Sequence, residues 1–124
     1  MNFSDFIATT LKQKVSEDFR TSHLRGPAKT IAEAITKLIR NDIKGEPTGG
    51  GCQAFLTPTS RRSQGFYVPK EVVLVLLFDG GSLAPYMNPD YGYTKGFDAM
   101  QGLLYRMGYW TERQNTVEAH VYKR

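Results

Sequence analysis

Residues 72–78 form an uninterrupted apolar run, Val-Val-Leu-Val-Leu-Leu-Phe, with Glu71 before it and Asp79 after it. Seven residues are too few to cross a bilayer, and the run lacks the polar alternation of a strand with one wet face. The run therefore predicts a central strand that is buried on both faces. A chain with such a strand needs apolar cover on two sides, which restricts it to layered folds.

Two helices are predicted before this strand. An amphipathic helix over residues 4–20 follows from apolar residues spaced four apart, with Ser4 as its N-cap; these residues are Phe3, Ile7, Leu11, Val15 and Phe19. Pro27 suits the first turn of a second helix, which Gly45 and Pro47 stop. The apolar positions of the second helix are Ile31, Ile35, Leu38, Ile39 and Ile43.

The remaining sequence alternates turn signals with short apolar segments. We predict strands over residues 52–57 and 65–68, a polar loop over 59–63, a hairpin over 79–87 with Pro85 in its return strand, a helix over 97–107 ending at Gly108, and a strand over 117–122. This order predicts an α+β fold with a mainly antiparallel sheet of about four to five strands. The 124 residues fit a single domain, 1–124.

The positive charge is concentrated in one segment. Sixteen basic and twelve acidic residues give a net charge of +4, and residues 47–70 contain Arg61, Arg62 and Lys70 but no acid. Phe66 and Tyr67 follow the two arginines. Guanidinium groups bind phosphates and aromatic rings stack on bases, so the segment predicts binding of a nucleotide or of single-stranded nucleic acid. The alternative is a solvated arginine loop beside core aromatics.

Catalytic patterns are weak. Cys52 with His23 or His120 is the only candidate for nucleophilic catalysis by cysteine, and a lone cysteine is usually a small core residue. Glu118 and His120 point to the same face of the last strand, either as an acid–base pair or as a solvated face. We therefore predict no catalytic residue and rank an enzyme third among the possible functions.

One cysteine and two histidines exclude an intramolecular disulfide and argue against a Cys/His zinc site. We predict neither a metal nor a cofactor. The single cysteine indicates a reducing compartment, and the sequence shows neither a signal peptide nor a membrane-spanning run. We therefore expect a cytoplasmic protein that does not bind membranes.

Three further segments have two interpretations each. The Gly-rich residues 46–51 lack the Gly-Lys-Ser/Thr ending of a P-loop, which favours a turn over a phosphate cradle. The cluster of Tyr86, Asn88, Tyr91 and Tyr93 indicates either a recognition surface or loops packed on the sheet. His23 and Arg25, between the first two helices, form a second possible anion site if copies of the chain assemble symmetrically, and otherwise lie in solvent.

These features together resemble small phage proteins that sequester nucleotide immune signals, among them the first Thoeris anti-defence sponge family. The family is similar in length and joins N-terminal helices to a β-rich remainder. The resemblance implies a stacking role for Phe78, hydrogen bonding by Asn88, and ligand arginines among Arg61, Arg106 and Arg113. It also implies a homo-oligomer with cyclic trinucleotides bound near His23 and Arg25.

We therefore expect a non-enzymatic, phage-encoded protein that sequesters a small anionic, cyclic nucleotide immune signal in the host cytoplasm. The expected ligand-binding residues are Arg61, Arg62, Phe78, Asn88, Tyr91, Arg106 and Arg113. The alternative is a protein that binds nucleic acid directly or inhibits a host enzyme through a protein interface.

Overall fold

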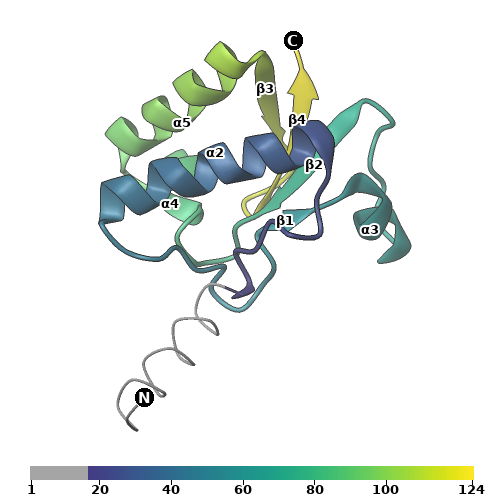
Figure 1. Ribbon diagram of the computed structural model, residues 1–124, viewed down its shortest axis with the longest axis horizontal. Coiled ribbons are helices and arrows are strands. Elements are labelled where there is room, and N and C mark those ends of the chain that lie inside the picture. The colour runs from purple at the N-terminus through teal and green to yellow at the C-terminus, as the bar shows by residue number, and fades with distance from the viewer. Residues whose placement is uncertain (1–16) are drawn as a thin grey trace, which may run out of the picture.

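Figure 1 shows the computed structural model, which describes residues 17–124. The predicted helix over residues 4–20 therefore lies almost entirely outside the described residues. In chain order the elements are α2 (Gly26–Ile43), β1 (Phe55–Leu56), α3 (Pro58–Ser63), β2 (Val72–Leu77), α4 (Ala84–Met87), the 3-10 helix η1 (Pro89–Tyr91), α5 (Thr94–Met107), β3 (Tyr109–Arg113) and β4 (Glu118–Lys123).

The strands described in residues 17–124 form one sheet in the order β1-β2-β4-β3, and every neighbouring pair is antiparallel. This confirms the α+β class and the antiparallel sheet, which has four strands. β2 lies between β1 and β4, and its residues Leu74, Val75 and Leu76 have no exposed surface. The prediction of a central strand buried on both faces is confirmed.

One face of the sheet is covered by α2 and α5, which lie side by side in Figure 1. α2 forms as predicted, because Ile31, Ile35 and Ile39 recur on one face and are fully buried against the sheet. Pro27 occupies the first turn, and the helix ends where Lys44 takes a left-handed conformation with φ 54°. The helix contributes Ile31, Ala32, Ile35 and Ile39 to this core.

The helix predicted over residues 97–107 is α5, with Met100 and Leu104 buried. Its C-cap is Gly108, as predicted, with φ 95° and its N–H donated to Leu104 O and Tyr105 O. The chain then enters β3, which was not predicted. Its sequence, Tyr-Trp-Thr-Glu-Arg, lacks a clear alternation of apolar and polar residues, because only Tyr109 and Thr111 are half-buried and the other three residues are exposed.

Three local predictions are wrong. Residues 59–63 belong to the helix α3, which Thr57 caps by accepting a hydrogen bond from Ser60 N at 3.0 Å. Residues 65–68 form no strand. The hairpin over 79–87 is also wrong, because Pro85 lies in the first turn of α4, where a missing N–H costs nothing.

The Gly-rich turn that precedes β1 packs against the turn that follows β2. A Cβ on Gly50 would lie 2.3 Å from Gly81 N, and one on Gly81 would lie 2.5 Å from Gly49 C. Both Gly50 (φ 65°) and Gly81 (φ 73°) also have left-handed backbones. Ser82 N donates to Thr48 O at 2.8 Å. Gly50 and Gly81 therefore allow two backbones to meet, and this contact accounts for Gly50 without a phosphate. Gly51 has a left-handed backbone, with φ 97°, which favours glycine at that position.

Gly81→Ala is expected to lower the free energy of unfolding by about 2 kcal/mol, because it combines a left-handed backbone with a backbone clash. Gly102→Ala is the matched control. It lies inside α5, where the nearest atom to a new Cβ is the end of the Arg106 side chain at 3.1 Å, and it is expected to raise stability by about 0.5–1 kcal/mol. Urea denaturation measures both, and equal effects would refute the backbone contact.

Candidate functional site

Arg61 holds α3 against the sheet. Its Nη2 donates to Glu118 Oε1 on β4 at 2.7 Å, and its Nε lies 3.4 Å from Glu118 Oε2. The same guanidinium lies 3.5 Å from the centre of the Phe66 ring. Arg61 is therefore already neutralised by a carboxylate and covered by an aromatic ring, so little of it remains to bind a phosphate.

Glu118 and His120 are both buried under α3, so the interpretation of a solvated face is wrong. His120 Nε2 donates to Glu118 Oε2 at 2.9 Å. Burial by itself would raise the pKa of Glu118, but the hydrogen bonds from Arg61 and His120 outweigh it and lower that pKa. His120 Nδ1 is buried and has no partner among the residues that the structure describes. These three side chains form a buried ionic cluster, Arg61-Glu118-His120.

Arg62 is exposed and has a different role from its neighbour. Its Nε donates to Val68 O at 2.9 Å and its Nη2 donates to Pro69 O at 3.0 Å. These bonds hold the loop that joins α3 to β2 and fix the plane of the guanidinium. In the described part of the chain, Nη1 of Arg62 has no hydrogen-bond partner, so it is free to donate to a ligand.

A hollow of about 500 Å³ lies beside Arg62. Its lining also includes Tyr67, Val68, Lys70 and Glu71. Tyr67 is 86% exposed, which is unusual for a large aromatic ring and leaves its face open to solvent. We call Arg62, Tyr67 and Lys70 the Tyr67 surface. It combines a fixed guanidinium, a second cation and an uncovered ring, and Glu71 is the one acid that lines the hollow among residues 17–124.

The aromatic surface continues onto the sheet. Trp110 on β3 stacks on Tyr122 on β4 with ring centres 4.7 Å apart, and Trp110 is 43% exposed. Tyr122 packs against the cluster that contains Val68, the residue that follows Tyr67, and burial is the main cause that raises the pKa of Tyr122. Sequence reasoning did not identify Trp110 because β3 was not recognised as a strand.

The expected pair of Phe78 and Asn88 does not form a ligand site. Phe78 is 1% exposed and lies in the core, so the stacking role given to it is wrong. The Asn88 amide is also engaged within the fold. Its Oδ1 accepts from Asp90 N and from Arg113 Nη1, each at 3.0 Å, and its Nδ2 donates to Thr116 O at 3.3 Å. Asn88 and Arg113 therefore stabilise the loops at this end of the sheet.

The other expected residues do not converge on one place. Arg106 lies in the last turn of α5, on the sheet face opposite the one that α3 covers with Arg61 (Figure 1). Tyr91 is exposed at the end of η1. Of the seven ligand-binding residues expected from the sequence, only Arg62 lies on the Tyr67 surface.

His23 and Arg25 fasten the segment before α2 to its surroundings. His23 Nε2 lies 2.8 Å from Phe55 O, so this nitrogen carries the proton and donates to β1. Arg25 Nη1 donates to Ser22 O and Leu24 O at 2.9 and 2.8 Å. Cys52 Sγ donates to Gly49 O at 3.3 Å, so His23 and Cys52 each have a structural partner instead of one another.

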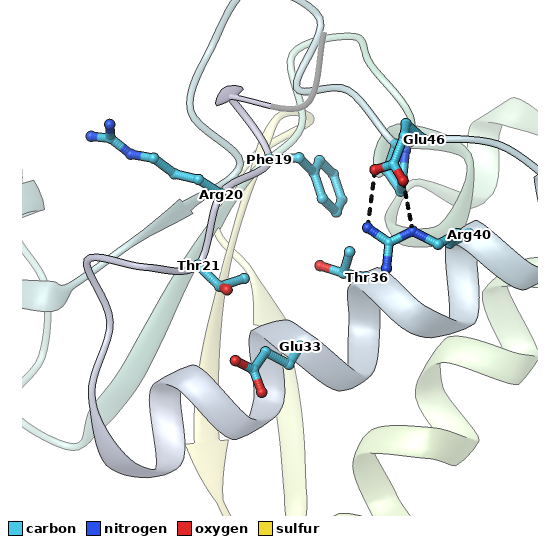
Figure 2. A pocket seen from close by; sticks show the side chains of 8 residues that line it. Phe19, Arg20, Thr21, Glu33, Thr36, Arg40 and Glu46 are labelled. Carbon is cyan, nitrogen blue, oxygen red and sulfur yellow. Dashed lines mark hydrogen bonds and ion pairs between the residues drawn. The ribbon is translucent and has the colours of Figure 1, made fainter. Parts of the chain in front are cut away.

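A second hollow, of about 300 Å³, lies between α2 and the segment that contains Phe19 and Arg20. Figure 2 shows Arg40 turned toward Glu46, with which it forms hydrogen bonds of 3.1 and 3.0 Å, and Arg20 pointing away from the hollow. Glu33 also lines it. Because Arg40 is already paired with a carboxylate, this hollow does not favour an anion.

Comparisons with known proteins found no matching family model, no similar curated protein and no similar solved structure. Among residues 17–124 no three His, Cys, Asp or Glu side chains gather as metal ligands would. Within the same residues no helix has the length and apolar character to cross a membrane.

Arg61→Ala is expected to lower the free energy of unfolding by about 3 kcal/mol, because it leaves the Glu118 carboxylate buried without its cation. Arg62→Ala is the matched control, since its bonds go to two carbonyls at an exposed edge and their loss costs about 1 kcal/mol. Urea denaturation of both variants measures the difference. Equal losses would show that the buried ionic cluster does not stabilise the fold.

Glu118 also makes stability depend on pH. Its pKa is lowered in the folded protein, so the carboxylate contributes stability above its ordinary pKa of 4.5, and this contribution is lost as the pH falls through the folded-state value. Glu118→Gln is expected to reduce stability at neutral pH, by an amount that shrinks in acid. Urea denaturation across the acid range measures it, with the exposed Asp98→Asn as control; a pH-independent deficit would contradict the prediction.

Proposed function

We propose that this protein is a non-enzymatic binder that sequesters a small anionic nucleotide on the Tyr67 surface. The observation that carries the proposal is the open Tyr67 ring, 86% exposed, in a hollow of about 500 Å³ with Arg62 and Lys70. That volume lies within the range of small-molecule sites. Withholding a nucleotide immune signal in a phage-infected host is the biological role we propose for this binding.

Each part of the surface has a defined task. The Tyr67 ring stacks on the base, an interaction worth about 1–3 kcal/mol per base. Arg62 donates to the phosphate from a guanidinium whose plane is already held by Val68 O and Pro69 O, so little side-chain entropy is lost on binding. Lys70 adds a mobile positive charge, while Glu71 repels a phosphate that binds too far toward β2.

We propose a non-enzymatic function because the reactive side chains are engaged in structural hydrogen bonds. Cys52 and His23 each hold a backbone carbonyl, and His120 is buried against Glu118. A nucleophile and its base need mutual hydrogen-bond contact and access to substrate. The proposed activity is therefore stoichiometric binding.

A second candidate function is binding of single-stranded nucleic acid. It is favoured by the stacked Trp110 and Tyr122, because Tyr122 packs against the cluster that contains Val68, next to Tyr67 in the chain, and the pair extends the aromatic surface beyond the size of one nucleotide. Rings on neighbouring strands of an open sheet face are a common way to stack successive bases. Glu112 beside this pair reduces its attraction for phosphates.

Tyr67→Ala is expected to weaken nucleotide binding about tenfold, because stacking on the base is lost. Isothermal titration calorimetry with cyclic dinucleotides, cyclic trinucleotides, ADP-ribose isomers and oligothymidylate measures this. The matched control is Tyr105→Ala, which removes an exposed ring on the opposite side of the sheet and is expected to change nothing. No binding of any of these ligands by the folded protein would remove the proposal.

The same titrations separate the two candidate functions. For a small ligand, Trp110→Ala leaves the affinity unchanged and one cyclic nucleotide binds best. For a single strand, Trp110→Ala weakens binding as much as Tyr67→Ala does. Affinity then also falls with salt concentration, with a slope set by the number of phosphates contacted.

A further inference from the structure

Asp42, Tyr86 and Tyr93 meet where α2, α4 and α5 come together. The hydroxyls of both tyrosines donate to the same atom, Asp42 Oδ2, and the bond from Tyr93 is 2.6 Å long. The two rings pack edge to face with centres 5.5 Å apart. We call these three residues the Asp42 notch; they are independent of the Tyr67 surface, which lies around α3.

The notch is held rigidly in place. Tyr86 is buried, so its ring cannot turn away from Asp42. The Tyr93 ring lies directly on the backbone of α5, because a Cβ on Gly96 would come within 2.3 Å of it. A glycine in the first turn of a helix is otherwise unfavourable, and here it makes room for the ring. The carboxylate therefore faces any ligand in a preset orientation.

The notch carries a fixed negative charge. The hydrogen bonds from Tyr86 and Tyr93 lower the pKa of Asp42, and those bonds with Asp42 raise the pKa of Tyr93, so the carboxylate stays ionised and the hydroxyls stay protonated at neutral pH. Asp42 is exposed, and its Oδ1 has no hydrogen bond from any residue in the range 17–124. One carboxylate oxygen is therefore open to a donor.

Two hollows flank the notch, and they differ in charge. The first, of about 330 Å³, is lined by the notch together with Ile43, Ser82 and Pro85. Ile43 is 45% exposed, which leaves apolar surface beside the carboxylate uncovered. The second, of about 380 Å³, contains Lys95, whose charge helps to lower the pKa of Asp42. A cation is thus accepted on the Ile43 side and repelled on the Lys95 side.

We propose that the Asp42 notch binds a cationic group on an aliphatic stem, with the ammonium at Asp42 and the stem along Ile43 and Pro85. An ammonium has three N–H donors, and the notch has three acceptors in Asp42 Oδ1 and the hydroxyl oxygens of Tyr86 and Tyr93. The apolar wall distinguishes such a group from a hydrated inorganic ion. The group is either the lysine side chain of a partner protein or a free alkylamine.

The test is an NMR titration of the full-length, ¹⁵N-labelled protein with n-butylammonium, spermidine and a capped Gly-Lys-Gly peptide. Saturable shifts are expected at the amides of Asp42, Ile43 and Tyr93. Asp42→Asn is expected to weaken binding about tenfold, because it removes the charge and keeps the shape. Lys95→Met is expected to strengthen binding, because it removes a like charge.

The controls separate a cation site from an apolar one. 1-Butanol has the stem without the charge and is expected to leave these signals unchanged, and the exposed Asp98→Asn is expected to bind butylammonium as wild type does. Tighter binding of the peptide identifies a protein side chain as the ligand, and tighter binding of a free amine identifies a small amine. Absence of saturable shifts with all three cations, or equal shifts with 1-butanol, would overturn the proposal.

Discussion

Burial of β2 on both faces is the constraint on which the rest of the molecule depends. Leu74 and Leu76 point toward α2 and α5, and Val75 points to the other side, where it packs in a cluster with Leu56, Val68 and Val72. Neither face of such a strand can be left in water, because each exposed aliphatic side chain would forfeit roughly 1.5–3 kcal/mol of burial free energy. The two helices close one face, and the second face needs a separate cover.

That second cover is partly ionic, and it connects the core to the proposed binding surface. α3 is held on the sheet by Arg61 and Glu118, with His120 as the second donor to the carboxylate. A buried carboxylate has to be paired, so the position of α3 is tightly specified. Arg62 and the loop that carries Tyr67 follow directly from α3. The geometry of the Tyr67 surface therefore depends on a charge pair beneath it.

The parts of the fold that could be predicted are those whose contacts have a clear period. α2 and α5 show apolar residues every three or four positions, and β2 is a continuous apolar run. α3 has only six residues and no buried side chain, so its sequence has no regular spacing of apolar residues from which a helix could be predicted. β3 has only a few half-buried residues, so its sequence shows no clear strand pattern. The residues around Pro85 are compatible both with a return strand and with the first turn of a helix, and the sequence does not distinguish the two.

The candidate site shows the same division. Two adjacent arginines were predicted to act together, yet Arg61 faces inward to Glu118 and Arg62 faces the loop. Phe78 was expected to stack on a ligand, but it ends the buried strand and remains in the core. The sequence indicates Tyr67 as an aromatic ring near the arginines, but its exposure depends on the tertiary packing of the loop between α3 and β2.

The sequence by itself determined the fold class, the central strand, two helices and the segment in which basic and aromatic residues meet, because each depends on residues close together in the chain. Only the tertiary structure decided which of those side chains are free. Arg61 is neutralised by a residue 57 positions away, and Asp42 receives hydroxyls from residues 44 and 51 positions away. Pairing and burial over such separations are set by the packing of whole elements, which local spacing does not encode.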